Sequence, residues 1–195
     1  AKEYGEELTA PTVPDEIRKM GGLALGIEAD VTDRHQVDAM TEQAVERFGR
    51  IDILVTNAGG ALVPGPSYAT QVTEADFRKM VDINFWGTFN CCQAVAEGMK
   101  NRRYGKIVTV GSQAGLRDSA QSHGGGTAYS VAKAAIHHYT RKLASELGPY
   151  NVTVNCIAPG LILSSRAIAG GRGTPESRAR LEPMTALHRL GEPEE

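Results

Sequence analysis

The sequence lacks a charge excess and long apolar runs, and each absence argues against a class of protein. Its 195 residues hold 21 Lys and Arg against 23 Asp and Glu, a formal net charge of −2. The basic residues are scattered, so nothing points to nucleic acid as a partner. No apolar stretch reaches membrane length, and the opening residues AKEYGEEL do not resemble a signal peptide. We therefore expect a cytoplasmic protein with no nucleic-acid or membrane partner.

Cysteine and histidine are too sparse and too badly spaced for a metal site. Of the three cysteines, Cys91 and Cys92 are adjacent and Cys156 lies far downstream, without a C-x-x-C motif. Of the five histidines, His137 and His138 are neighbours that face different sides of a predicted helix. We expect no metal, and reduced thiols that pack as small apolar groups.

What the sequence does have is an alternation of apolar runs and helical periods. Segments rich in Val and Ile predict strands, and three- and four-residue apolar steps predict helices. Such alternation is typical of an α/β fold: a doubly wound parallel sheet in three α/β/α layers, formed by a single domain. The expected strands are Leu23–Asp30, Ile51–Asn57, Gly105–Ser112 and Asn151–Gly160; the expected helices are Asp33–Phe48 (Val37, Met40, Ala44 and Phe48 inward), Glu74–Asn101 and a third within Gly124–Pro149.

Polar and small residues stand where each expected strand ends. They are Asp30, then Asn57, Ala58 and Gly59, then Ser112, and finally Pro159 and Gly160. In an open parallel sheet, ligands bind outside the carboxyl ends of the strands. The pattern therefore predicts a ligand site at this edge.

The long helix carries a polar residue on its apolar side. Asn84 falls in line with Val81 and Thr88, where an unpaired amide would be costly. Either neighbouring backbone satisfies Asn84, or the residue marks a kink or a polar site that faces the cleft.

The last helix places a phenol and an ammonium one turn apart. Tyr129 and Lys133 are four residues apart and share a face, beside the apolar stripe from Ala128 to Leu147. Lys133 could simply be solvated, with its stem on the ring. Alternatively, the cation favours the phenolate and makes Tyr129 a proton-transfer group near neutral pH.

Together these motifs resemble the short-chain dehydrogenase/reductase family. The resemblance runs from about Asp30 to the C-terminus and rests on an ordered set of segments: DVTD, NAG, DINFWG, IVTVGSQAG, AYSVAK, NCIAPG and LHRLGEPEE. It implies a Rossmann-like dinucleotide-binding and catalytic domain over residues 1–195. It also implies that the protein transfers a hydride between a nicotinamide cofactor and a small-molecule secondary alcohol or ketone. The cofactor would be NAD or NADP, with NAD slightly preferred. The family resemblance further suggests a homotetramer.

The resemblance also implies a role for individual residues. Tyr129 would be the general acid/base, Ser112 would hydrogen-bond the substrate oxygen, and Lys133 would bind the nicotinamide ribose and assist the tyrosine. Asn84 would hold a water of the proton relay. The cofactor would be held by Asp30, Val31, Asn57, Ala58, Gly59, Tyr129, Lys133, Pro159, Gly160, Ile162 and Ser164.

The sequence departs from the family pattern in several places. The family often has Asn at the position of Thr56, Ser at Gly111 and Thr at Ser164. The segment from Gln113 to Ala128 is longer than usual and would border the substrate side; a plain surface loop is the other interpretation. A G-x-x-x-G-x-G motif, whose backbone normally binds the pyrophosphate, is not found.

Two other functions remain as alternatives. HGGG (His123–Gly126) and GPSYA (Gly65–Ala69) resemble esterase motifs, but their order along the chain is reversed. A catalytically silent nucleotide-binding relative would keep the fold without turnover; the intact Ser112, Tyr129, Lys133 and Asn84 argue against it.

The resemblance makes Leu23–Asp30 the third strand of the fold and Ile51–Asn57 the fourth. The first two strands would lie between them in the order 3-2-1-4-5-6. Residues 1–22 contain no such strands, only a short helix that starts near Pro14. We therefore expect the working enzyme to have more chain at both ends.

Overall fold

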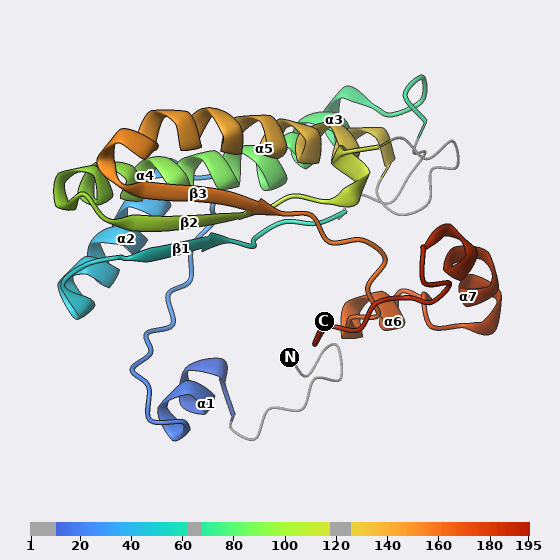
Figure 1. Cartoon of the computed structure of the whole chain (residues 1–195), viewed down its shortest axis with the longest axis horizontal. Coiled ribbons are helices and arrows are strands. Elements are labelled where there is room, and N and C mark those ends of the chain that lie inside the picture. The colour runs from blue at the N-terminus through green and yellow to red at the C-terminus, as the bar shows by residue number, and fades with distance from the viewer. Residues whose placement is uncertain (1–10, 62–67, 118–125) are drawn as a thin grey trace. The chain divides into compact units, whose positions relative to one another are not determined.

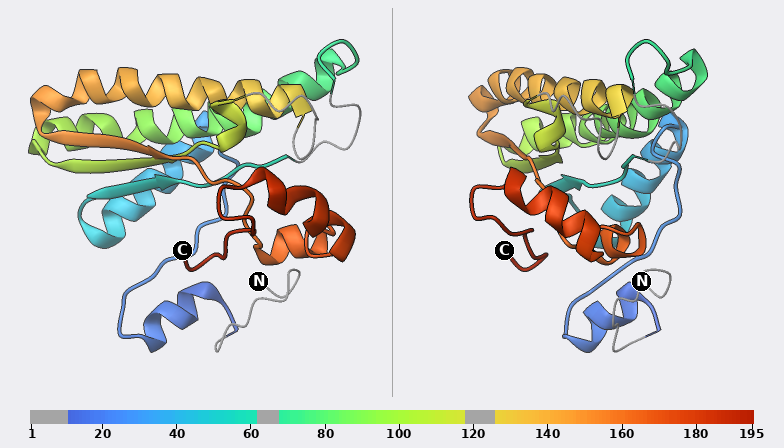
Figure 2. Two further views of the ribbon diagram at one scale, coloured as in Figure 1. Left: turned by 45° about the vertical axis from the view of Figure 1, so that its right-hand side comes forward. Right: turned by 90° about the vertical axis from the view of Figure 1, so that its right-hand side faces the viewer.

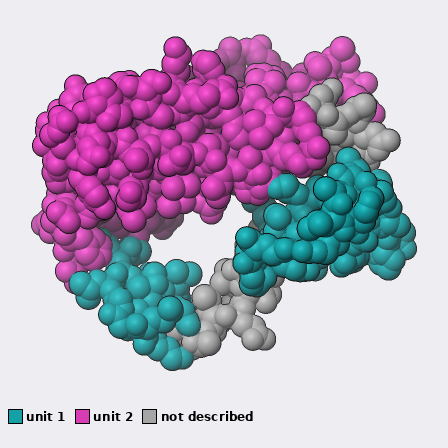
Figure 3. Space-filling model, in the orientation of Figure 1, with its two compact units in different colours: residues 1–26, 160–195 teal, residues 27–159 magenta. Residues whose placement is uncertain are grey.

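The computed structural model describes residues 11–61, 68–117 and 126–195. The chain divides into two compact units (Figure 3). One is formed by residues 27–159, and the other by residues 1–26 together with 160–195. We describe each unit by itself. Within the described residues, no helix is both long and apolar enough to cross a membrane.

A parallel sheet forms the centre of the unit 27–159. Its strands are β1 (Ile53–Thr56), β2 (Gly105–Val110) and β3 (Val152–Ile157), in the order β1-β2-β3. Thr56 pairs with Thr109, which pairs with Cys156, so the three strands reach the same edge together. The predicted parallel α/β sheet is confirmed, and three of the four expected strands are present with trimmed ends.

Helices α4 (Gly87–Arg102) and α5 (Gly126–Leu147) cover one face of this sheet (Figures 1 and 2). The predicted α5 stripe is confirmed, since Ile136 and Leu147 are fully buried. The main core consists of apolar side chains from α4, α5, β2 and β3: Cys92, Val95, Met99, Ile107, Leu143, Leu147, Val152 and Val154. On the opposite face, Ile53 and Val55 are 60% and 55% exposed.

Helix α2 (Arg34–Phe48) packs against α4. Its first turn is capped by the carboxylate of Asp33, which accepts from the N–H groups of His35 and Gln36. Val37 is fully buried, as predicted, but Phe48 is 40% exposed, so its predicted inward position is wrong. Phe48 is the last residue of the helix, and its ring lies beside the Arg47 guanidinium instead.

The predicted strand over Leu23–Asp30 is also wrong. These residues form no ladder with any described strand, and the boundary between the two units falls between Gly26 and Ile27. Leu23 is 71% exposed. An apolar run becomes a strand only when a neighbour accepts and donates its backbone hydrogen bonds. Among the strands that the structure describes, β1 pairs only with β2.

The predicted helix Glu74–Asn101 is present but interrupted. It consists of α3 (Glu74–Val81), a π-helical turn at Asp82–Trp86, and α4. A π-turn holds one extra residue, and such turns often mark functional sites. Asn84 lies at its centre.

The second unit contains short helices: α1 (Val13–Lys19), α6 (Ser165–Ala169) and α7 (Pro175–Leu181). Pro14 stands at the start of α1, as expected, and Thr12 caps the helix. A small core of Leu163, Leu181 and Leu190 holds residues 160–195 together. Whether the whole chain acts as a single domain stays a prediction.

Single-turn helices connect the main elements: Gln113–Gly115 after β2, Gly148–Tyr150 after α5, and Glu182–Met184 after α7. The first of these turns packs tightly on α5. A Cβ added at Gly115 would lie 2.5 Å from the backbone nitrogen of Ala134 and 2.6 Å from the carbonyl carbon of Lys133. Only glycine permits this approach.

Gly115→Ala is therefore expected to lower the free energy of unfolding by about 1–3 kcal/mol, as overpacking against backbone does. The control is Gly148→Ala, because a Cβ at Gly148 meets nothing within 4 Å. Urea unfolding of both variants measures the difference. Equal stability of the two variants would contradict the close packing of this turn on α5.

Candidate active site

The carboxyl ends of β2 and β3 are joined by backbone hydrogen bonds. The N–H of Gly111, just after β2, donates to the carbonyl of Ile157 at the end of β3, at 2.9 Å. The N–H of Gln113 donates to the carbonyl of Pro159 at 3.0 Å. The segments that follow β2 and β3 are thus held side by side, at the edge where the sequence predicts a ligand site.

Tyr129 and Lys133 meet on the first turns of α5. The Lys133 ammonium lies 5.6 Å from the centre of the Tyr129 ring and donates to the Val110 carbonyl at 2.8 Å. Lys133 is only 4% exposed, so the solvated interpretation is wrong. Burial lowers the pKa of Lys133, because the charged form loses hydration. A buried ammonium is therefore held at the end of β2, over a phenol ring.

Ser112 follows β2 directly and begins the turn Gln113–Gly115. Its backbone is extended, with φ −166° and ψ 151°, and its Oγ accepts from the N–H of Ala114 at 3.2 Å. The hydroxyl proton is then available to another acceptor. Because Gly115 packs on the backbone of α5 at Lys133, Ser112 is held beside the helix that carries Tyr129 and Lys133.

Asn84 links the interrupted helix to the loop after β1. It is fully buried, its Oδ1 accepts from the N–H of Gly60 at 2.9 Å, and its Nδ2 donates to the carbonyls of Gly60 and Met80 at 3.1 and 3.0 Å. The first interpretation is confirmed, because backbone satisfies the amide. The helix also departs from α geometry at Asn84, but an amide that faces the cleft stays a prediction. Its role with a water stays a prediction.

The loop after β1 relies on glycine. Gly59 and Gly60 have φ of 135° and 142°, which side chains disfavour. A Cβ at Gly59 would lie 2.7 Å from Asn84 Oδ1. Asn57 and Ala58, the other residues of the NAG segment, are exposed.

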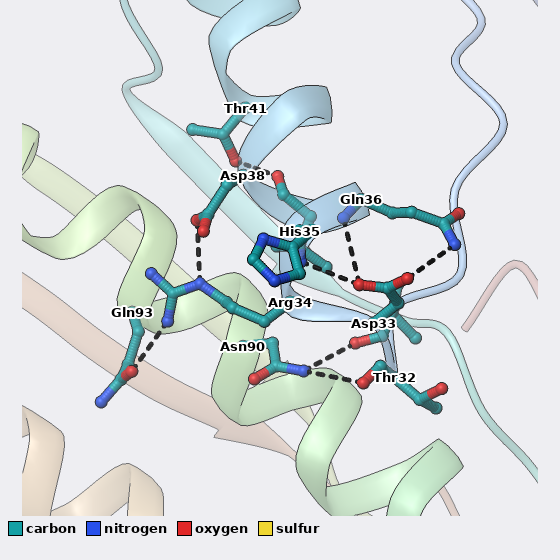
Figure 4. A network of polar contacts seen from close by, with 11 residues as sticks. Thr32, Asp33, Arg34, His35, Gln36, Asp38, Thr41, Asn90 and Gln93 are labelled. Carbon is teal, nitrogen blue, oxygen red and sulfur yellow. Dashed lines mark hydrogen bonds and ion pairs between the residues drawn. The ribbon is translucent and has the colours of Figure 1, made fainter.

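Asn90 of α4 holds the segment that follows Asp30, as Figure 4 shows at Thr32. Asn90 donates through Nδ2 to the carbonyls of Val31 and Thr32, at 3.0 and 3.4 Å. The Asp30 carboxylate bonds within its own segment: its Oδ1 accepts from the N–H and the hydroxyl of Thr32 at 2.9 and 2.8 Å. Asn90 is only 8% exposed.

The remaining predicted cofactor residues divide between the units. Pro159 ends the unit 27–159, whereas Gly160, Ile162 and Ser164 belong to the other. There, Ile162 forms an isolated parallel bridge with Gly191, and Ser164 caps α6 by accepting from the N–H of Ala167 at 3.3 Å.

Sequence reasoning missed three residues that support this edge: Gly60, Asn90 and His137. Asn90 could have been found by the argument that singled out Asn84, because it too is an amide on the buried side of the long helix. His137 was considered only as a metal ligand. It is 8% exposed and contacts Ser112, whereas its neighbour His138 is exposed, so the two do face different ways.

Some predicted features lie outside the described residues. These are most of HGGG and GPSYA, and the middle of the Gln113–Ala128 segment, residues 118–125. Across residues 11–61, 68–117 and 126–195, no three His, Cys, Asp or Glu side chains gather closely enough to hold a metal ion.

The strand-end edge fits a nicotinamide dinucleotide at Lys133. Within the described part of the chain, the Lys133 ammonium has one hydrogen-bond acceptor, the Val110 carbonyl, so further N–H donors are available for ribose hydroxyls. The missing side chain of Gly59 makes room for Asn84.

The sequence matches the family described as short chain dehydrogenase over residues 5–170, and the chain belongs to this family. Cyclohexanol dehydrogenase of Rhodococcus sp. (strain TK6) is 45% identical over 203 residues, which cover 100% of this chain and 72% of that protein. A 7α-hydroxysteroid dehydrogenase, solved with NADH and 7-oxo glycochenodeoxycholic acid, superposes with a TM-score of 0.79 at 35% identity, over 92% of this chain and 68% of that one.

A further solved relative carries the other nicotinamide cofactor. ElxO with NADP bound superposes with a TM-score of 0.78 at 28% identity, over 92% of this chain and 72% of that one. These matches confirm the Rossmann-like α/β fold and an oxidoreductase family whose members use nicotinamide cofactors.

Proposed function

We propose that this protein transfers a hydride between NAD or NADP and a small secondary alcohol or ketone, with Tyr129 as general acid/base. The observation that carries the proposal is the buried Lys133 ammonium over the Tyr129 ring, anchored at the end of β2. Burying a cation is costly, so a site that keeps one beside a phenol favours chemistry that uses it.

Each residue of the group has a distinct task. Tyr129 passes a proton to or from the substrate oxygen, and Ser112 donates its hydroxyl proton to the same oxygen. Lys133 stabilises the phenolate by its charge and binds ribose hydroxyls with its remaining N–H donors. Asn84 holds a water through which the proton reaches solvent. When bound, the nicotinamide ring accepts or supplies the hydride.

The cofactor is proposed to lie along the strand-end edge. Asp30 and Val31 would contact the adenine, and Asn57, Ala58 and Gly59 would line the turn beside the cofactor. Pro159, Gly160, Ile162 and Ser164 would hold the nicotinamide end, as the family resemblance implies. Relatives with NADH and with NADP support either cofactor, and we retain the slight preference for NAD.

The experiment that tests this function is an assay with both cofactors over a panel of secondary alcohols and ketones. The panel includes cyclohexanol, because a cyclohexanol dehydrogenase is 45% identical to this chain. We expect cofactor reduction with at least one cyclic alcohol. Cofactor binding without turnover across the panel would instead support the catalytically silent alternative.

We also propose a cytoplasmic homotetramer. An aromatic cluster supports the tetramer, because its Trp86 side chain is 44% exposed. The cluster consists of Phe85, Trp86 and Phe89 with Tyr139 of α5. Ile136 of α5 is fully buried in the core and does not belong to this surface. Light scattering at micromolar concentration is expected to give the mass of four chains, and a monomer would contradict the proposal.

A further inference from the structure

His137 connects the site to the strand behind it. It lies on α5 one turn after Lys133 and is 8% exposed. Its Nε2 lies 3.0 Å from the Ser112 carbonyl oxygen and 3.4 Å from the Ser112 nitrogen, and its Nδ1 lies 3.3 Å from Cys156 Sγ. One imidazole thus contacts the backbone of Ser112 and the half-buried side chain of Cys156 in β3.

The distances favour one tautomer. Nε2 cannot both donate to the carbonyl and accept from the N–H of Ser112, and the contact to the carbonyl is shorter by 0.4 Å. With the proton on Nε2, Nδ1 has a lone pair that accepts the Cys156 S–H. In the opposite tautomer, Nε2 would accept a long hydrogen bond from the Ser112 N–H, and Nδ1 would donate to the Cys156 sulfur, which is a weak acceptor. His137 therefore donates to the Ser112 carbonyl.

The ring has little freedom to leave this position. A Cβ at Gly111 would collide with His137 Cε1, and would lie 2.7 Å from Nε2 and 2.9 Å from Cys156 Sγ. The backbone of Gly111 is therefore in direct contact with the ring. This accounts for Gly111, where the family often has Ser. The residue before Ser112 must lack a side chain for the His137 ring to fit.

The Ser112 carbonyl has a second donor, the N–H of Gly115 at 3.0 Å, which closes the turn Gln113–Gly115. Ser112 is thus restrained from two sides, by its own turn and by α5. A substitution of His137 would remove the restraint that α5, the helix of Tyr129 and Lys133, places on Ser112.

We propose that His137, supported by Cys156 and made possible by Gly111, is a positioning residue that holds Ser112 for hydrogen bonding to the substrate oxygen. The proposal rests on the proposed function. His137 does not touch the substrate; it acts through the backbone of Ser112, so its effect depends on the Ser112 hydroxyl being present.

The test is a double-mutant cycle between His137 and Ser112. His137→Leu removes the donor and is expected to lower kcat by about tenfold, the effect of one lost hydrogen bond. The dissociation constant of the cofactor should stay within about twofold, because no cofactor contact changes. In the Ser112→Ala background, the same His137→Leu change should alter kcat by less than about twofold.

Two further variants separate positioning from general stability. His137→Gln keeps an N–H donor that reaches the Ser112 carbonyl, and is expected to recover kcat to within about threefold of the wild type. Thr140→Val is the matched control. Thr140 is a buried polar residue nearly one turn further along α5, bonded to Thr109 at 2.7 Å and to the Ile136 carbonyl at 2.8 Å. Thr140→Val should lower the melting temperature and leave kcat within about twofold of the wild type.

The outcomes distinguish the two proposals. If Ser112→Ala itself leaves kcat unchanged, the proposed function fails. If Ser112→Ala lowers kcat but His137→Leu lowers it by the same factor in both backgrounds, the proposed function stands and the role of His137 is overturned. Failure of His137→Gln to recover activity while folded also overturns it, as does a Thr140→Val enzyme as slow as His137→Leu.

Discussion

Tyr129→Phe is expected to lower turnover of a secondary alcohol by about 10²–10⁴-fold, the usual contribution of a general acid/base. The substitution deletes the hydroxyl and keeps the ring over which the Lys133 ammonium lies. The ammonium keeps its bond to the Val110 carbonyl, so its contact with the ribose should survive. Turnover should therefore fall while the dissociation constant of the cofactor changes by less than about threefold.

Initial rates and a fluorescence titration of the reduced cofactor measure the two quantities. The matched control is Tyr139→Phe, a half-buried tyrosine of the same helix that packs on the rings of Phe85 and Phe89. Burial raises the pKa of Tyr139, so it has no reason to act as a base. Turnover by Tyr129→Phe within about tenfold of the wild type would reject Tyr129 as the acid/base.

Lys133→Met is expected to have the second-largest effect, a loss of turnover of up to about 10²-fold. The ammonium lies 5.6 Å from the centre of the Tyr129 ring, and a unit charge at that distance is worth about 3 kcal/mol at an effective dielectric constant near 20. This is the charge stabilisation that the variant removes. Unlike Tyr129→Phe, this change should also weaken cofactor binding, because the N–H donors proposed for the ribose are lost. Lys142→Met, at an exposed position of the same helix, is the control and should retain wild-type kinetics.

The same substitution has a predicted signature in stability. Because burial lowers the pKa of Lys133 below its usual value of 10.5, the unfolded chain binds more protons than the folded one between the two pKa values. The free energy of unfolding of the wild type should therefore rise with pH through that alkaline window. Lys133→Met should lack this rise and be no less stable than the wild type at neutral pH. Loss of stability comparable to a core cavity would show that Lys133 serves the fold instead.

Periodicity and residue type were enough to predict the elements that carry the site. The four-residue step from Tyr129 to Lys133 places both on one face wherever the helix forms, and the helix is assured by the apolar stripe that ends at Leu147. Likewise, the Val- and Ile-rich run before Ser112 predicts β2, and a parallel sheet puts its end beside those of β1 and β3. These are local patterns with a single structural outcome.

Other features depended on partners that the sequence does not name. The π-turn around Asn84 requires the Gly60 backbone as a partner, and that pairing spans 24 residues. The ring of His137 meets Ser112 and Cys156 only because β2 and β3 share one particular register. Leu23–Asp30 has the composition of a strand, yet no described strand pairs with it. Composition sets a preference for a strand, but a ladder partner decides whether one forms.

The measurement that tests the central claim most directly is the fate of the hydrogen on the carbinol carbon. A secondary alcohol deuterated at that carbon is incubated with the enzyme and the oxidised cofactor, and the reduced cofactor is analysed by mass spectrometry. Direct hydride transfer predicts one deuterium on the reduced cofactor for each ketone formed, and loss of both products in Tyr129→Phe. Ketone formed without nicotinamide, or deuterium released to water instead of carried to the cofactor, would contradict the account.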